Sequence, residues 1–356
     1  MIQSHNLQIQ KLLIKADAVN SPYDRIKLIK KAINIADAHN DTEWGFDLRK
    51  QIIAAERSTS SCMEGLPAFT WILDTYEHHP ELCDESTFMM EYKWMIQAAR
   101  RNADVSMQQF ESIVEDYKIR LQRNGFTLHS YYTAKAQMAF QQNRLDEAKL
   151  YLDMRKFEER DDLSHCVACE IHDLVEYELL TGNIDAAISI AHPIFSGKER
   201  CVYVPFQTVC TALNILDKYG YDDSAETLFK IADALLNTMR QEYDMPNIGH
   251  IGQIIYFFTK RDKNRAWNIF EEYVEWSIDC EDYFNYQFSS GVLSLFKGSG
   301  TRDMNVSPRM PWHQPLELYK FSELYAYYWN QASTLAAKFD ARNGGTNFTD
   351  ELNSMS

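Results

Sequence analysis

Three cysteines and a histidine have the residue types and the spacing of a metal site. Cys166, Cys169 and His172 follow one another at intervals of three residues, so a helix would place them on one face. Cys201 comes 35 residues after Cys166. Tetrahedral zinc accepts thiolate and imidazole ligands in this mixture. The three cysteines, with His172 or His165 as the fourth ligand, therefore predict a structural zinc site as one alternative.

Two other interpretations fit the same cysteines. They can be small apolar side chains in a tight seam between helices. They can also form a redox switch, because a thiol at a helix N-terminus has a lowered pKa. One Cys-x-x-Cys without a second such pair does not decide among the three. Our first expectation is that the chain holds no cofactor, with structural zinc as the alternative.

A weak internal repeat predicts the helices that must position these residues. Four segments read as an apolar helix, a turn and a second helix, with an alanine five residues after the turn. The equivalent alanines are Ala148, Ala187, Ala225 and Ala266. They lie about 39, 38 and 41 residues apart, a period typical of the helix pairs of an α-solenoid. Because Cys201 falls close to one repeat after Cys166, we expect their sulfurs to converge.

The repeat and the composition together predict the fold class. We expect an all-α protein in which antiparallel helix pairs form a right-handed superhelix. With only 13 Gly and 9 Pro, the chain suits helices joined by short turns.

The repeat also predicts the domain organisation. We expect a single α-solenoid domain at 1–340, whose clearest repeats span 127–280. Residues 281–340 include a helix rich in aromatic side chains. They are expected to form an atypical C-terminal capping unit, because the end of a solenoid needs a different outer face. The polar residues 341–356 are expected to be disordered.

One copy of the repeat resembles the tetratricopeptide repeat. It has small residues at Ala212, Gly220, Ala225 and Ala232 and an aromatic residue at Phe229. Small residues let two helices approach closely, and the aromatic ring fills the gap to the next pair. That family repeats at 34 residues, and the units here are about one helical turn longer. The resemblance implies a helical-repeat fold and the binding of other proteins.

A second resemblance covers the cysteines. The segment RDDLSHCVACE and the later YELLTGNIDAAISIAHPIFSGKERCVYVP are similar to a segment of uncharacterised bacterial tetratricopeptide-like proteins. The shared features are an Arg-Asp pair, a Cys-x-x-Cys and a later Cys-x-x-x-Pro, in the same order. This resemblance implies a bacterial protein and carries no assigned chemistry.

The first helices of successive pairs are expected to line a concave groove that binds a peptide or a partner helix. Alignment on the repeat alanines places polar side chains on that face. The expected groove residues are Thr133, Gln137, Gln141, His172, Glu176, Gln207, Cys210 and Asn214. Amides and a carboxylate suit hydrogen bonds to a peptide backbone and to a basic side chain. The alternative is that these residues are simply solvated.

Charge and targeting signals limit the partners. A formal net charge of −15 disfavours direct binding to nucleic acid or to an anionic membrane, and suits a basic protein or peptide. The N-terminal segment lacks the apolar core of a signal peptide, and no apolar run is long enough to cross a bilayer. Seven cysteines, an odd number, are expected to be reduced thiols. We therefore expect a cytoplasmic protein.

The expected function is protein or peptide binding without catalysis. The sequence has no Gly-x-Ser-x-Gly elbow, no dinucleotide-binding fingerprint and no zinc-protease helix. One form of this expectation is a bacterial regulatory or immunity-type protein that sequesters a basic protein. The rival is a metal- or redox-controlled protein, or an enzyme, centred on Cys166, Cys169 and Cys201.

Overall fold

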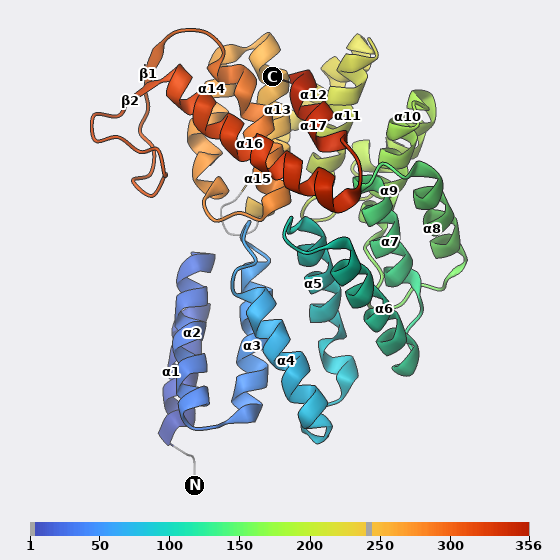
Figure 1. The fold of residues 1–356 in the computed structure, drawn as a ribbon, viewed down its shortest axis with the longest axis vertical. Coiled ribbons are helices and arrows are strands. Elements are labelled where there is room, and N and C mark those ends of the chain that lie inside the picture. Colours follow the sequence, from blue (N-terminus) through green and yellow to red (C-terminus); the bar gives the residue numbers. More distant parts are fainter. Residues whose placement is uncertain (1–3, 240–243, 356) are drawn as a thin grey trace.

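The computed structural model describes residues 4–239 and 244–355, and these fold almost entirely into helices (Figure 1). The predicted all-α class is confirmed. The parts of the predicted domain and tail at residues 1–3, 240–243 and 356 lie outside the described residues. The described residues form seventeen α-helices: α1 Ser4–Asp17, α2 Pro22–Ala38, α3 Thr42–Glu56, α4 Gly65–His78, α5 Met89–Arg101, α6 Met107–Arg123, α7 His129–Gln141, α8 Leu145–Phe157, α9 Val167–Leu180, α10 Ile184–Phe195, α11 Phe206–Lys218, α12 Asp222–Leu236, α13 Ile248–Arg261, α14 Lys263–Tyr273, α15 Asp282–Val292, α16 Phe321–Asn343 and α17 Asn347–Met355.

Short elements connect some of these helices. The 3-10 turns within the described residues are η1 Pro80–Leu82, η2 Glu85–Phe88, η3 Met245–Asn247, η4 Val274–Ser277 and η5 Leu293–Phe296. A small antiparallel sheet pairs β1 (Thr301–Asp303) with β2 (Leu318–Lys320) and closes the long loop before α16.

Local signals in the repeat set where its helices end. In three of the four repeat pairs, the turn contains a residue in the left-handed region, which stops a helix and which Gly or Asn adopts at the least cost. These residues are Asn143 (φ 55°), Gly182 (φ 79°) and Gly220 (φ 76°). The repeat alanines are all at most 1% exposed: Ala148, Ala187, Ala225 and Ala266. The repeat pattern therefore marks a buried alanine in all four pairs and a left-handed turn in three of them.

Consecutive helices pack against each other as antiparallel pairs along most of the chain. Among the helices up to α14, the neighbours joined by the shortest turns are α1 with α2, α2 with α3, α7 with α8, α9 with α10, α11 with α12, and α13 with α14. The first helices α9, α11 and α13 also contact one another in sequence.

The helices after α14 fold back over the rest of the molecule. α15 packs along α13, and α16 lies across α15 (Figure 1). The contact between α13 and α15 needs glycine, because a Cβ on Gly252 would lie 2.5 Å from Cα of Phe288. The aromatic rings of this region fill the interior, with Phe270, Phe288 and Tyr328 all buried.

Contacts far apart in sequence join the C-terminal helices to the N-terminal part. Ser60 Oγ donates to the carbonyl of Trp276 at 2.6 Å, and Arg101 Nε donates to Glu281 at 3.0 Å. Arg342 also donates to the carbonyl of Arg100 at 2.9 Å. In a simple solenoid each unit contacts only its neighbours. These bonds show that this chain closes on itself.

The C-terminal tail corrects the expectation of disorder after residue 340. α16 continues to Asn343, and Gly344 (φ 73°) ends it in a left-handed conformation. α17 then packs back, with Phe348 and Leu352 buried. Phe348 and Leu352 are four residues apart, so they lie on the same face of α17. Burial of these two side chains is enough to fix an otherwise polar helix against the protein.

None of the helices formed by the described residues combines the length and apolar character needed to cross a lipid bilayer.

Candidate metal centre

The turn between α8 and α9 sets the position of the first two cysteines. Asp161 accepts hydrogen bonds from the backbone N–H groups of Leu163 at 3.0 Å and Thr127 at 2.8 Å, which ties the turn to the start of α7. Cys166 follows as the N-cap of α9 in an extended conformation, and Cys169 lies in the first turn of the helix. Both sulfurs therefore lie near the positive end of the α9 dipole.

Cys201 reaches the same place from the loop after α10. Gly197 (φ 74°) turns the chain at the end of that helix. The backbone N–H of Cys201 donates to the carbonyl of Val204 at 2.9 Å. The backbone N–H of Val204 in turn points to Cys201 Sγ at 3.5 Å. This tight turn holds the third sulfur against α9.

The structure brings the three sulfurs into one cluster. Sγ of Cys169 lies 3.3 Å from Sγ of Cys166 and 3.5 Å from Sγ of Cys201. All three lie within 4.8 Å of one another. Cys166 is exposed and the other two are half-buried. One metal ion could therefore contact all three sulfurs from the protein surface.

His172 does not belong to this cluster, which corrects the predicted fourth ligand. Its Nδ1 lies 3.0 Å from Thr208 Oγ1, between α9 and α11. The ligand group formed by the described residues contains cysteines only. His172 lies one turn further along α9 than Cys169, and its ring contacts Thr208 of α11, whereas the cluster forms at the start of the helix.

The hydrogen bonds within the cluster shift the pKa values of two of its thiols in opposite directions. Hydrogen bonds from Cys166 and Cys169 lower the pKa of Cys201. Hydrogen bonds with Cys166 and Cys201 raise the pKa of Cys169. Cys201 is thus the thiol of this pair that ionises first.

Lys93 of α5 is a half-buried cation beside the cluster. Its Nζ donates to the carbonyls of Leu163 at 2.8 Å and Ser164 at 3.3 Å, in the segment that leads to Cys166. Burial and the charge of Arg57 lower the pKa of Lys93 to about 8, and the nearby cysteines oppose this shift. A negative charge on the sulfurs would therefore be partly offset by Lys93.

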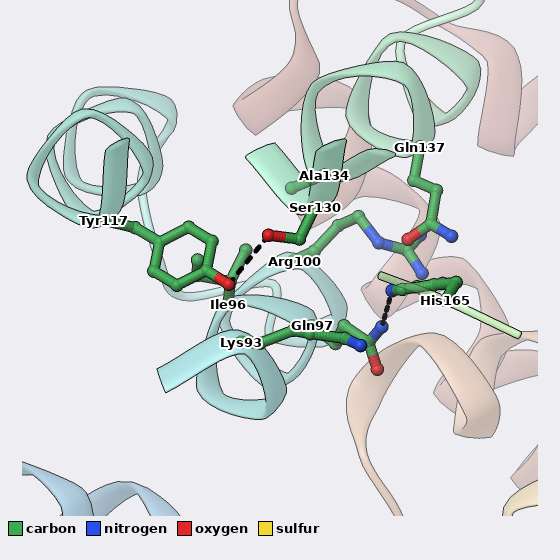
Figure 2. A pocket seen from close by; sticks show the side chains of 9 residues that line it. All are labelled: Lys93, Ile96, Gln97, Arg100, Tyr117, Ser130, Ala134, Gln137 and His165. Carbon is green, nitrogen blue, oxygen red and sulfur yellow. Dashed lines mark hydrogen bonds between the residues drawn. The ribbon is translucent and has the colours of Figure 1, made fainter. Parts of the chain in front are cut away.

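A small polar pocket lies between α5, α6, α7 and the residue before Cys166 (Figure 2). Tyr117 and Ser130 share a hydrogen bond of 2.9 Å on one side, and Gln97 lies 3.2 Å from His165 Nε2 on the other. Burial and the charge of Lys93 lower the pKa of His165 to about 3. The free space is on the order of one water molecule, so the pocket suits a bound water better than a substrate.

The predicted groove residues are more buried than an open groove requires. Thr133 and Cys210 are fully buried, and Gln141 is 7% exposed. The half-buried members are Gln137, His172, Glu176, Gln207 and Asn214. The C-terminal helix covers one end of this face, because Arg342 donates to Gln141 Oε1 at 2.9 Å.

Three of these polar residues form hydrogen bonds from the first helix of one pair to the start or first helix of the next pair. Gln137 donates to Asp173 Oδ1 at 3.3 Å, and Gln207 donates to Asn247 Oδ1 at 3.4 Å. The contact of His172 with Thr208 lies between them in the stack. The bonded partners are 36, 40 and 36 residues apart, respectively, close to one repeat. The predicted face therefore serves to join the repeats to one another.

A buried ion pair beneath this face was not predicted from the sequence. Arg155 of α8 donates to Asp173 of α9 at 2.5 Å, and both side chains are at most 5% exposed. Arg155 continues the buried stripe of Ala148 and Leu152 at helical spacing. A charged residue on a buried stripe is the signal that could have identified it.

No protein family, curated protein or solved structure was found to match this chain.

Proposed function

We propose that this chain is a tetratricopeptide-like helical-repeat protein that binds a basic protein or peptide and does not itself catalyse a reaction. A regulatory or immunity-type bacterial protein is one form of this proposal. The repeat arrangement is supported by the equivalent left-handed turns, by the buried alanines and by the hydrogen bonds between successive first helices.

An exposed apolar stripe on α8 carries the proposal. Leu150, Met154 and Phe157 lie on one face of the helix, at spacings of four and three residues. They are 56%, 37% and 88% exposed. α8 lies at the outer edge of the molecule, where a partner can reach it (Figure 1). Aligned large apolar side chains on a surface are typical of a protein contact.

Acidic residues recur at one position of the outer helices along this edge, although Lys149 and Lys156 of α8 are exposed as well. Asp146, Asp185 and Asp223 occupy equivalent positions, each in the first turn of an outer helix, and all are exposed. Acidic residues are favoured at helix N-termini in any case. Their repetition on neighbouring helices is in keeping with the net charge of the chain, which is −15. Asp146 lies one turn before Leu150, so the charged row and the apolar stripe meet on α8.

This surface selects one kind of partner, a protein segment that is apolar on one side and basic on the other. The apolar side would cover Phe157 and its neighbours, and the basic side would face the aspartates. We therefore place the partner contact on the outer face of α8 and not in the concave groove. Most of the predicted groove residues are buried or form hydrogen bonds to other residues of this chain.

Site-specific cross-linking tests the proposal. A photoreactive phenylalanine analogue replaces Phe157 in one version of the full chain and Leu316 in another. Leu316 is a matched control because it is 87% exposed on the loop before α16. In the native cells we expect a basic protein to be cross-linked from position 157 and not from position 316.

Binding of the identified partner is then measured with purified proteins. Phe157→Asp should weaken binding at least tenfold, Leu316→Asp should leave it unchanged, and added salt should weaken it further. Cross-linking from position 157 only to a second copy of this chain would contradict the proposal, as would the same cross-linked proteins from both positions.

A further inference from the structure

We propose that Cys166, Cys169 and Cys201 bind a single Zn²⁺ ion as three thiolate ligands, with the fourth coordination position open to an exogenous ligand. This proposal is independent of partner binding on α8, because it rests on a different surface and on different residues.

The distances between the sulfurs fit one ion. Zinc–sulfur bonds of about 2.3 Å in a tetrahedron separate the sulfurs by about 3.8 Å. The separations of 3.3 and 3.5 Å from Cys169, with all three within 4.8 Å, require only small shifts to reach this geometry. A disulfide would join two of the three sulfurs and leave the third unpaired, whereas a metal ion uses all of them.

The backbone holds the ligands in place before any metal binds. Cys166 is fixed by the start of α9, and Cys169 lies in the first turn of that helix. Cys201 is fixed by its tight turn with Val204. The cluster thus joins two segments 32 residues apart, at the contact between consecutive helix pairs. Little chain entropy would be lost on metal binding, because the ligand positions are already ordered.

The surroundings also suit the charge of the filled site. Three thiolates exceed the charge of Zn²⁺ and leave a net negative charge. Lys93 and the positive end of α9 are both close enough to offset it. Lys93 also donates to the carbonyls of Leu163 and Ser164, so it supports the loop that carries Cys166.

The fourth position is the distinctive feature of the site. Among the described residues, no histidine or carboxylate joins the three cysteines. Cys166 is exposed, so the open side of the cluster faces solvent. Zinc sites with three protein ligands keep a water or a substrate at the fourth position. We infer that water occupies it in the resting protein and that a small thiol or an imidazole can replace the water.

Zinc loading and cysteine alkylation test the site in the unmodified chain. The reduced protein is dialysed with Zn²⁺, its metal content is measured, and its thiols are alkylated with and without the metal. We expect one zinc per chain and slower alkylation of Cys166, Cys169 and Cys201. Cys83 is half-buried outside the cluster and should react at an unchanged rate. A reduced, folded protein that binds no zinc would overturn the proposal.

Matched variants identify the ligands. Cys201→Ser should lose stoichiometric zinc, whereas Cys83→Ser should retain it, with circular dichroism confirming that both variants are folded. Retention of one zinc by folded Cys201→Ser would overturn the assignment.

Cobalt substitution tests the open position. The Co²⁺ form should show thiolate-to-cobalt charge-transfer absorption, and added imidazole or 2-mercaptoethanol should shift its ligand-field bands. A spectrum that does not respond to either ligand would contradict the open fourth position.

Discussion

Arg155 and Asp173 show how single charged residues organise the interior of this protein. The guanidinium of Arg155 contacts the carboxylate of Asp173 at 2.5 Å and the carbonyl of Glu170 at 3.3 Å. Asp173 also accepts a hydrogen bond from Gln137. One carboxylate therefore connects α7, α8 and α9. A polar face that resembles a binding groove in the sequence is, at the scale of its residues, a set of internal connections.

Removal of this carboxylate should strongly destabilise the fold. In Asp173→Ala the buried guanidinium of Arg155 loses its counter-charge, which typically costs about 3–5 kcal/mol. Asp153→Ala is the matched control, because Asp153 pairs with Lys149 on the exposed face of α8 with side chains 52% and 47% exposed. That change should cost less than about 1 kcal/mol. Urea denaturation measures both, and equal losses of stability would contradict the role of Asp173.

At the scale of elements, local sequence signals predict the helix pairs well and their ends less well. The alanines recur at one period, and a left-handed turn residue precedes three of the four, so together they identify the pairs from residue 127 onward. The helix that carries Cys169 and His172 begins only at Val167, because Cys166 forms the N-cap. The helix rich in aromatic side chains begins at Phe321, because the preceding residues Leu318–Lys320 pair with β1. A strand of three residues is too short to show a recognisable alternation in the sequence, so the helical pattern that follows it hides it.

Two neighbouring alanines on α10 provide a test of the repeat register. Ala187 is 1% exposed at the contact with the paired helix, whereas Ala186 is exposed. Ala187→Trp should lower the free energy of unfolding by about 1–3 kcal/mol or more through overpacking. Ala186→Trp introduces the same side chain into the same helix, but at an exposed position, so it should have little effect on stability. Thermal denaturation compares them, and similar melting temperatures would show that the register is wrong.

At the scale of the whole molecule, the contacts that close the chain could not be predicted from the sequence. Ser60 with Trp276 and Arg101 with Glu281 join segments more than 170 residues apart, and no periodic pattern marks such pairs. The approach of Cys201 to Cys166 was predictable because it follows the repeat. The absence of His172 from that cluster was not, because it depends on the contact of its ring with Thr208 of α11. Sequence reasoning therefore succeeds where a property follows the repeat and fails where one residue departs from it.

The half-buried His250 of α13 should make the stability of the whole molecule sensitive to mild acid. Burial lowers the pKa of His250 to about 3, helped by the charge of His172. Its Nδ1 is buried without a hydrogen-bond partner. The unfolded chain binds a proton at this residue near pH 6.5, whereas the folded chain remains neutral. The contribution of His250 is therefore present above pH 6.5 and is lost as the pH falls toward 3.

The magnitude follows from proton linkage and can be measured with one pair of variants. A single such histidine makes the free energy of unfolding fall by about 1.4 kcal/mol per pH unit below pH 6. His250→Phe removes this proton, so its stability should fall less steeply than that of the wild type between pH 6 and pH 5, whatever its stability at pH 7. His192→Phe changes an exposed histidine on α10 and should keep the wild-type slope. Urea denaturation at several pH values gives the three slopes. Parallel curves for His250→Phe and the wild type would mean that the imidazole of His250 is protonated in the folded protein, and that its environment is more polar than the packing around α13 indicates.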